Sequence, residues 1–148
     1  MRRPIATILT LVPLALPWPA AATTVTGTLN GHNYEAVSSA GLGWAAAKLA
    51  ARKRGCGWNL AALTSQAEDQ FVFGLIKGKA EFFVGTDGPW LGGYQKSSRV
   101  EPGVPPGQYE SFLSHKLNGQ WNDHHPEALF HGYVAESDAA TQNACQSP

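Results

Sequence analysis

Residues 118–127, which read NGQWNDHHPE, gather several side chains that could bind a metal ion or a polar ligand. Asn122 and Asp123 carry side-chain oxygens, and a hard cation such as calcium takes six to eight oxygen ligands. Adjacent residues of a strand face opposite ways. Asn122 and Asp123 can therefore share one ion only if the strand distorts or if the ion lies at its edge. The two oxygen-bearing side chains make this segment a candidate calcium site.

The histidines of this region favour a surface loop over a zinc site. Imidazole is a common zinc ligand, but His124 and His125 are neighbours whose side chains tend to diverge. No Cys/His spacing motif accompanies them or His131.

The sequence contains no catalytic motif of a hydrolase. No GxSxG elbow is present, and no serine, histidine and acid stand out as a triad. Glu101 and Glu110 could form the carboxylate pair of a glycoside hydrolase, but nothing else indicates such a cleft. We therefore do not predict an enzyme.

Two helices are expected ahead of this segment. Residues 44–54, WAAAKLAARKR, are rich in alanine, apolar on one side and basic in the final turns. This pattern predicts a helix that ends before Gly55. Ser65 and Glu68 form a capping box, in which the Ser65 hydroxyl accepts from a free backbone N–H and Glu68 reaches back. The apolar residues that follow predict a second helix, ending at Gly78.

The remaining apolar segments predict short strands. Asn118-Gly119 marks a tight hairpin turn, and residues 95–107 predict a surface loop rich in proline and glycine. The order of one strand, two helices and then several strands favours an α+β fold with mainly antiparallel sheet. Strands are expected at 32–38, 60–63, from Trp90, at 108–113, from Trp121 and at 130–136, with 81–84 as a short strand or an extended connection.

The N-terminal residues predict export. Arg2 and Arg3 precede an apolar stretch over 5–16, and the alanines at 20–22 are the small residues that a signal peptidase prefers. Residues 1–22 are therefore expected to be a cleaved signal peptide. The apolar stretch is shorter than the roughly 20 residues of a membrane span. No later segment is expected to cross a bilayer, so we predict no membrane insertion after cleavage.

The rest of the chain has the size of one ordinary domain. Removing Arg2 and Arg3 from eleven basic residues leaves nine against eleven acidic ones, a net charge of about −2. This charge argues against a nucleic-acid-binding protein, which would normally carry a basic patch. We expect one domain over 23–137 and a polar C-terminal tail over 138–148, in a secreted or periplasmic protein.

Two cysteines, Cys56 and Cys145, are compatible with one disulfide in an oxidising compartment. Two unpaired thiols are the alternative. Cys145 lies in the polar tail, and the sequence cannot supply the geometry that a disulfide requires.

Four sequence elements follow one another in the chain: the helix that begins with SQAE, WLGG at residues 90–93, WND at residues 121–123 and the terminal GYVAE at residues 132–136. Together they resemble the C-type lectin-like domain over nearly the whole mature chain. WLGG matches the WIG-type motif of that family, and residues 121–123 match its WND motif. The resemblance implies a fold of two helices, short and mainly antiparallel sheets and a long loop. It also implies non-catalytic carbohydrate binding.

In that family the WND strand and the long loop hold a calcium ion, and two sugar hydroxyls complete its coordination. Carried over by position, the resemblance implies four calcium ligands: Glu101, Glu110, Asn122 and Asp123. The same four residues, together with Tyr109 and His124, are the expected ligand-binding residues. The expected partner is a carbohydrate or a cell-surface glycan.

The sequence also departs from the family pattern. Gly103 replaces the asparagine of the Glu-Pro-Asn motif, which begins here at Glu101-Pro102, so one amide ligand is missing. The long loop is shortened, without its usual tryptophan-rich part. Phe112 stands where relatives have a loop cysteine, and a Cys56–Cys145 bond would be a displaced version of the domain-closing disulfide. These departures leave a second interpretation open, a metal-independent protein-interaction or adhesion module of the same fold.

Overall fold

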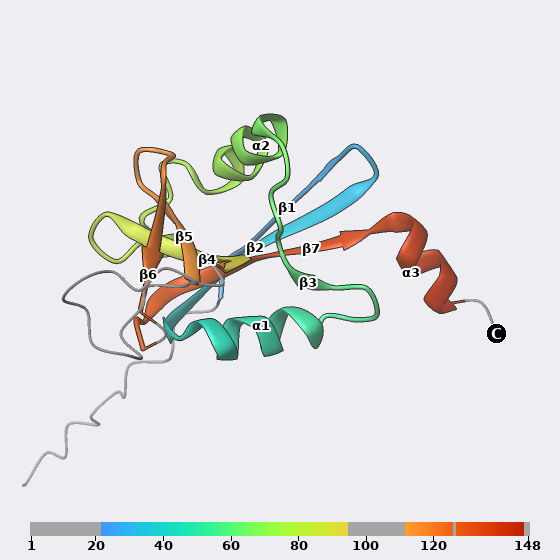
Figure 1. Cartoon of the computed structure of the whole chain (residues 1–148), viewed down its shortest axis with the longest axis horizontal. Helices are drawn as coiled ribbons and strands as arrows, with labels where there is room; N and C mark the ends of the chain where they lie inside the picture. Colours follow the sequence, from blue (N-terminus) through green and yellow to red (C-terminus); the bar gives the residue numbers. More distant parts are fainter. Residues whose placement is uncertain (1–21, 95–111, 126, 147–148) are drawn as a thin grey trace, which may run out of the picture.

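The structure is a computed structural model that describes residues 22–94, 112–125 and 127–146. Within these residues the strands form one sheet, ordered β1-β2-β7-β4-β5-β6, with β3 pairing to β7 beside this path. The strands and helices, shown in Figure 1, are β1 Thr24–Leu29, β2 His32–Leu42, α1 Trp44–Arg52, β3 Asn59–Leu60, α2 Gln66–Ile76, the 3-10 turn η1 Ala80–Phe82, β4 Asp87–Tyr94, β5 Phe112–Lys116, β6 Trp121–His124, β7 Phe130–Asp138 and α3 Ala139–Gln146. The predicted α+β class with mainly antiparallel sheet is confirmed.

β7 is the central strand of the sheet. It pairs antiparallel with β2 and β3, and parallel with β4. Gly132 of β7 has φ 150°, and a Cβ there would lie 2.3 Å from the backbone oxygen of Val37 on β2. Only glycine therefore allows the two backbones to approach this closely. This contact explains the glycine of the GYVAE segment.

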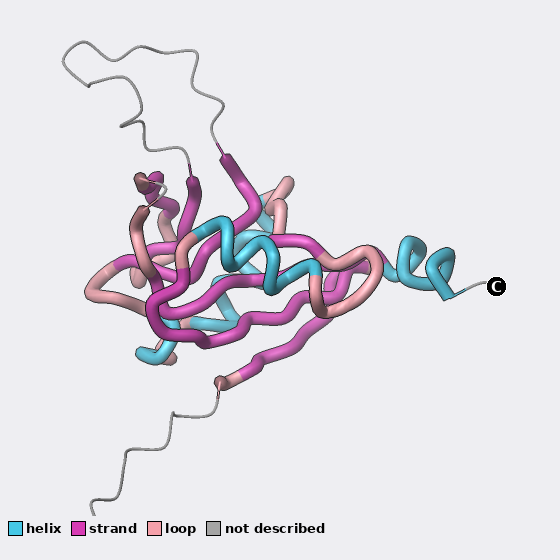
Figure 2. The backbone as a smooth tube through the Cα atoms, turned by 90° about the horizontal axis from the view of Figure 1, so that it is seen from below, coloured by secondary structure: helices cyan, strands magenta, loops and turns pink. Residues whose placement is uncertain are grey.

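The helices α1 and α2 cover opposite faces of the β2–β7 region, as Figures 1 and 2 show. On one face, Val72 and Ile76 of α2 pack in a core with Tyr34, Ala36 and Val134. On the other face, a second core joins two alanines of α1 to the sheet and to Trp90 of β4, which is fully buried: Val37, Ala47, Ala51, Leu60, Trp90, Phe130, Tyr133 and Ala135. Both faces of β2 and β7 are thus buried by apolar side chains.

The two predicted helices and the hairpin turn are confirmed. α2 begins at the capping box, since Ser65 Oγ accepts from the Glu68 N–H and the Glu68 carboxylate accepts from the Ser65 N–H. The turn between β5 and β6 contains Gly119 with φ 84°. The Lys116 N–H donates to Gln120 O across this turn.

Four elements differ from the sequence-based expectations. The strand predicted at 60–63 is only Asn59–Leu60, and neither β1 nor α3 is predicted. Residues 81–84 are expected to be extended, but Ala80–Phe82 form a 3-10 turn. Phe82 and its neighbour Phe83 both enter the core beside α2. A regular strand would send adjacent side chains to opposite faces, so the turn is what buries both rings.

In the described ranges, no helix combines the length and the apolar character that crossing a membrane requires.

Candidate functional site

The strand that carries Asn122 and Asp123 lies at the edge of the sheet. Among the described strands, β6 pairs with β5 alone, in a continuous register that sets Ser114 opposite Asn122 and Leu113 opposite Asp123. Asn122 and Asp123 therefore face opposite sides of a regular strand. The strand is not distorted here, so a shared ion would have to lie at its edge. β6 meets that condition because it is an edge strand.

Four polar side chains meet on one face of this region and form what we call the His124 cluster: Asp87, Ser114, Asn122 and His124. Nε2 of His124 lies 2.9 Å from Ser114 Oγ and 3.3 Å from Asn122 Nδ2. The same Nδ2 donates to Asp87 Oδ1 at 3.3 Å. An amide nitrogen can only donate, so Nε2 accepts in this arrangement. Both of these Asn122 contacts use Nδ2, and Oδ1 is thus the Asn122 atom that can serve as a ligand.

His124 does not lie in a surface loop, and that prediction is wrong for this residue. It is the last residue of β6 and pairs with Phe112. Its ring centroid lies 4.5 Å from that of Phe130 and 5.8 Å from that of Trp90, both edge-on. These aromatic contacts hold the ring against the second core. His125 follows the strand and is partly exposed.

The His124 cluster contains a serine, a histidine and an aspartate but has no triad geometry. Asp87 Oδ1 lies 3.8 Å from the same Nε2 that faces Ser114. A catalytic triad needs the acid on one ring nitrogen and the nucleophile on the other. Ser114 is also fully buried. The arrangement fixes side chains and gives Ser114 no access to a substrate.

The structure positions part of the predicted ligand set. Asn122, Asp123 and His124 lie on β6, whereas Glu101, Tyr109 and Glu110 fall outside the described residues, as do Pro102 and Gly103. β5 begins at Phe112, two residues after Glu110 in the sequence.

Trp121 lies at the surface and is not part of the core. It is 44% exposed, whereas Trp90 is fully buried. The Trp121 indole N–H donates to Asp69 Oδ1 at 2.7 Å. The same carboxylate oxygen lies 2.7 Å from Nε2 of His115, the cross-strand partner of Trp121. Trp121 is thus bound at the sheet edge by Asp69 of α2 and does not fill the interior.

His115 is a buried histidine that the sequence analysis does not identify. Its side chain has no exposed surface, and its Nδ1 has no hydrogen-bond partner within the described part of the chain. Nε2 must carry a proton in order to donate to Asp69. Burial lowers the pKa of His115 below its ordinary value of 6.5, and the hydrogen bond and charge of Asp69 partly oppose this effect. The ring is therefore neutral in the folded protein near pH 7.

We expect the protein to lose stability as the pH falls below about 6.5. The unfolded chain protonates His115 near its ordinary pKa of 6.5, whereas the folded chain takes up this proton only at lower pH. The contribution is complete above the unfolded pKa and is lost as pH falls toward the folded pKa. Melting temperatures recorded between pH 7.5 and pH 5 measure this dependence. A His115→Asn variant should show a shallower decline than the parent chain.

A His131→Gln variant is the matched control, because His131 lies on β7 and its side chain makes no hydrogen bond among the described residues. It should keep the decline of the parent chain. Equal slopes in the parent chain and in His115→Asn would show that His115 does not cause the acid sensitivity.

A second group of potential metal ligands lies where α2 meets the sheet. It consists of His32, Glu68 and Glu136. One ligand atom from each lies within 4.8 Å of the other two. His32 Nδ1 lies 2.5 Å from Glu136 Oε1, and the Tyr34 hydroxyl donates to Glu68 Oε1 at 3.4 Å. Hydrogen bonds from Thr64 lower the pKa of Glu68. The three residues come from β2, α2 and β7, so the capping role of Glu68 is the only signal that the sequence gives for this group.

The structure contains a disulfide between Cys56 and Cys145. Their Cα atoms lie 6.1 Å apart, within the range of protein disulfides. The bond joins the segment after α1 to helix α3. Gly57 and Thr141 are in contact beside it, since a Cβ at Gly57 would lie 3.0 Å from Thr141 Cγ2.

Together, the sheet topology, the helices on its two faces and the Trp90 and Trp121 motifs define a C-type lectin-like fold. The resemblance in sequence is thereby confirmed at the level of the fold.

Solved structures of this fold match most of the chain. The cow carbohydrate-recognition domain of CD23, solved in the presence of a GlcNAc2Man3 oligosaccharide, is 21% identical with a TM-score of 0.57; the match covers 83% of this chain and 97% of that one. The mouse scavenger receptor C-type lectin domain is 19% identical, with a TM-score of 0.55 over 76% and 93% of the two chains. Rhodocetin, solved in complex with the integrin α2-A domain, is 14% identical with a TM-score of 0.56 over 76% and 95%. No protein-family model and no curated protein sequence matches the chain.

Proposed function

We propose that the mature chain is an exported, non-catalytic carbohydrate-binding module whose ligand site lies at the edge of β6 that no described strand covers. The observation that supports this most directly is the edge position of Asn122 and Asp123 in a regular strand. The Cys56–Cys145 disulfide agrees with an oxidising, secreted or periplasmic location. The CD23 domain, solved with an oligosaccharide, is one neighbour of the same fold.

The donor set of this edge suits calcium. Oδ1 of Asn122 can coordinate an ion because the contacts to Asp87 and His124 use Nδ2. Asp123 adds a carboxylate from the other face of β6, and Glu101 and Glu110 would add two more oxygen donors from the segment between β4 and β5. Carboxylates and amide oxygens are ligands that calcium prefers. A bound calcium ion would supply open coordination positions for two hydroxyls of a sugar, with Tyr109 and His124 beside it.

Calcium at about 100 times its Kd should raise the free energy of unfolding by about 2.7 kcal/mol, since only the folded chain holds the ligands together. Melting the mature domain in calcium and in EDTA measures the shift, which should be several degrees for a domain of this size. Asp123→Ala should remove it. Glu81→Ala, which deletes an exposed carboxylate outside the proposed ligand set, should retain it.

A third variant, His32→Ala, separates the two possible metal sites. A calcium shift that survives Asp123→Ala but disappears in His32→Ala would assign the ion to the group of His32, Glu68 and Glu136. An unchanged melting temperature up to millimolar calcium would contradict calcium dependence altogether. A glycan array in calcium then tests for carbohydrate binding.

One observation favours a second candidate function, metal-independent protein binding. Leu117 and Trp121, at the two ends of the β5–β6 turn, are 50% and 44% exposed. Tryptophan is enriched at the centres of protein interfaces. Rhodocetin, solved with an integrin domain, shows a protein partner for another chain of this fold. A glycan array without signal in calcium, together with an unchanged melting temperature, would favour this function.

A further inference from the structure

Two adjoining cavities lie at the other end of the sheet from β6, and Trp58 and Glu35 line both of them. One cavity, of about 400 Å³, is completed by the end of α1 and the residues after it. The other, of about 430 Å³, is completed by side chains of β1 and β2 and by Gln142 of α3. We call the two cavities together the Trp58 groove. Each volume lies in the range of small-molecule sites.

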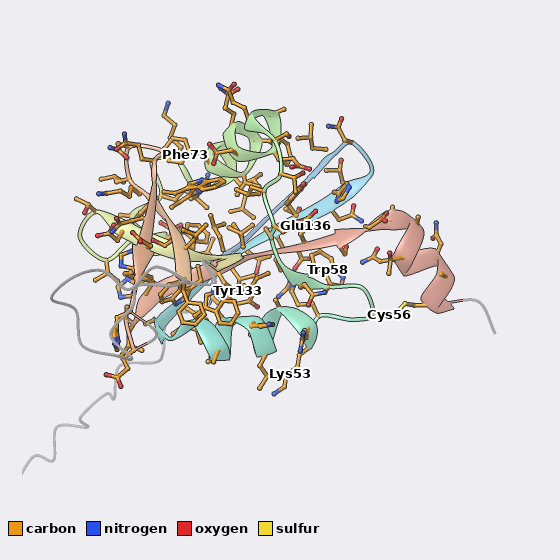
Figure 3. All side chains as sticks on the ribbon, in the orientation of Figure 1. Lys53, Cys56, Trp58, Phe73, Tyr133 and Glu136 are labelled. Atoms are coloured by element: carbon orange, nitrogen blue, oxygen red, sulfur yellow. A yellow bond between two sulfur atoms is a disulfide. The ribbon has the colours of Figure 1, made fainter. Side chains whose placement is uncertain are left out.

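The pairing of the strands explains why polar side chains gather in this groove. Thr26 lies opposite Glu35, and Thr28 lies opposite Asn33, so that the four side chains share one face of the β1–β2 hairpin. α1 covers the neighbouring part of this face with Ala47 and Ala51, but it ends at Arg52. Beyond this point, Trp58 lies beside β7, between the end of α1 and α3 (Figure 3). The face therefore stays accessible where the helix stops.

Two of the three charged side chains that line the groove neutralise one another. The Arg54 guanidinium forms an ion pair with the Glu35 carboxylate. It also lies 5.9 Å from the ring centroid of Trp58, at the outer limit of a cation–π contact. Lys53 is the remaining cation among the described lining residues. A phosphate-rich ligand would need several free cations, so this balance favours a ligand with little charge.

The other lining groups are donors and acceptors of hydrogen bonds. Asn33 Nδ2 and Gln142 Oε1 lie 3.5 Å apart, a long contact that a ligand hydroxyl could replace. The hydroxyls of Thr26 and Thr28 lie on exposed positions of the same face. Of the strongly exposed apolar side chains in the described structure, none lines the groove. Apart from Trp58, the groove thus lacks the large apolar anchors of a protein-docking surface.

A buried hydroxyl next to the groove has an unused hydrogen-bonding capacity. Ser137 is 2% exposed, and its Oγ has no hydrogen-bond partner among the described residues. Ser137 lies opposite Asn33 in the β2–β7 register, on the same face of the sheet. Buried polar groups normally have a partner, which can be water or a ligand. Ser137 lines neither cavity itself, but its cross-strand partner Asn33 lines the groove, so a water or ligand hydroxyl beside Asn33 would supply the missing partner.

From these groups we propose that the Trp58 groove is a metal-independent site for a hydroxyl-rich oligosaccharide of pyranose units. The apolar C–H face of one pyranose ring would stack on Trp58, since the face of an aromatic ring is electron-rich. Its hydroxyls would exchange hydrogen bonds with Glu35, Asn33 and Gln142. β1 and β6 are the opposite edges of the sheet. The groove is therefore separate from the proposed calcium edge, and either site could fail without the other.

A glycan array probed with the labelled mature chain in EDTA tests the proposal. We expect binding of at least one neutral oligosaccharide, whose Kd is then measured by calorimetry in EDTA. Trp58→Ala should weaken this binding at least tenfold, and Gln142→Ala about threefold. Trp121→Ala, which removes an exposed tryptophan of β6, and Asp123→Ala should leave the Kd unchanged.

Gln142→Ala keeps the test decisive if Trp58→Ala does not fold, because Gln142 is partly exposed on α3 and takes no part in either core. An array in EDTA without any bound glycan overturns the proposal. Binding that Trp58→Ala and Gln142→Ala leave unchanged also overturns it. Loss of binding in Asp123→Ala, with both groove variants unaffected, would assign the sugar to the β6 edge and not to the groove.

Discussion

Replacing Cys56 and Cys145 together with serine is expected to lower the free energy of unfolding by about 4 kcal/mol. The disulfide joins residues 89 positions apart. In the chain-entropy description, closing a loop of this length removes about 4.5 kcal/mol of conformational freedom from the unfolded chain. The bond also holds α3, a polar helix without buried side chains in its described part, against the segment after α1. Urea titration of the mature domain measures the loss.

The reduced parent chain is the matched comparison for this double variant. It has the same open loop without any substitution, so its midpoint in urea should agree with that of the variant. The slope of the free energy of unfolding against urea concentration should also be compared with that of the oxidised parent chain. A lower slope in the double variant would show that α3 and the segment after α1 have separated from the core. A loss below about 1 kcal/mol would contradict the prediction, because the bond would then restrain little of the unfolded chain.

The helices could be predicted because their signals are local. The Ser65–Glu68 box fixes the start of α2 through two hydrogen bonds that depend only on neighbouring residues. The alanine-rich 44–52 segment favours a helix by propensity, and Gly55 follows its end. Both assignments therefore needed no knowledge of distant partners.

β1 and α3 could not be predicted, because tertiary contacts define them. β1 reads TVTGTL, and its Gly27 weakens the strand signal, yet a Cβ there would lie 2.7 Å from Phe71 of α2. The glycine thus reflects the closeness of the helix. α3 is polar and short, and the disulfide together with the Asp138 side chain, which accepts from the Ala140 N–H, fixes it.

The sequence predicts that Asn122 and Asp123 diverge, and the regular register of β6 confirms this. It does not reveal their surroundings. The partners of Asn122 and Trp121 are Asp87 and Asp69, which come from β4 and α2. Trp121 has a large and apolar ring, but its edge strand and its hydrogen bond to Asp69 leave it at the surface. Side chains that meet across 35 or 52 positions give no periodic signal.

The second large effect is expected for Glu68→Ala, which should lower the free energy of unfolding by about 3 kcal/mol. Glu68 is 8% exposed, and its Oε2 accepts from the Thr64 N–H at 2.7 Å, the Thr64 hydroxyl at 2.8 Å and the Ser65 N–H at 3.0 Å. Its Oε1 accepts from the buried Tyr34 hydroxyl. Alanine would leave these donors without their partner, at about 1–3 kcal/mol for each one that stays buried and unpaired. Denaturant titration at pH 7 measures the loss.

The pH dependence of this loss separates the carboxylate from simple packing. Hydrogen bonds from Thr64 hold the pKa of Glu68 below its ordinary value of 4.5. A lowered pKa stabilises the fold above the unfolded pKa, and this stabilisation is lost as pH falls through the folded pKa. The difference between the parent chain and Glu68→Ala should therefore be constant above about pH 5 and shrink in stronger acid.

Two further variants complete this test of Glu68. Glu68→Gln keeps an acceptor oxygen without the charge and should lose only about 1–2 kcal/mol, because hydrogen bonds to charged groups are the stronger ones. Glu81→Ala removes an exposed carboxylate and should stay within about 0.5 kcal/mol of the parent chain. If Glu68→Gln lost no free energy at any pH while Glu68→Ala still lost about 3 kcal/mol, the charge would be irrelevant. The side chain would then stabilise the fold only by filling space and by accepting neutral hydrogen bonds between α2 and Tyr34.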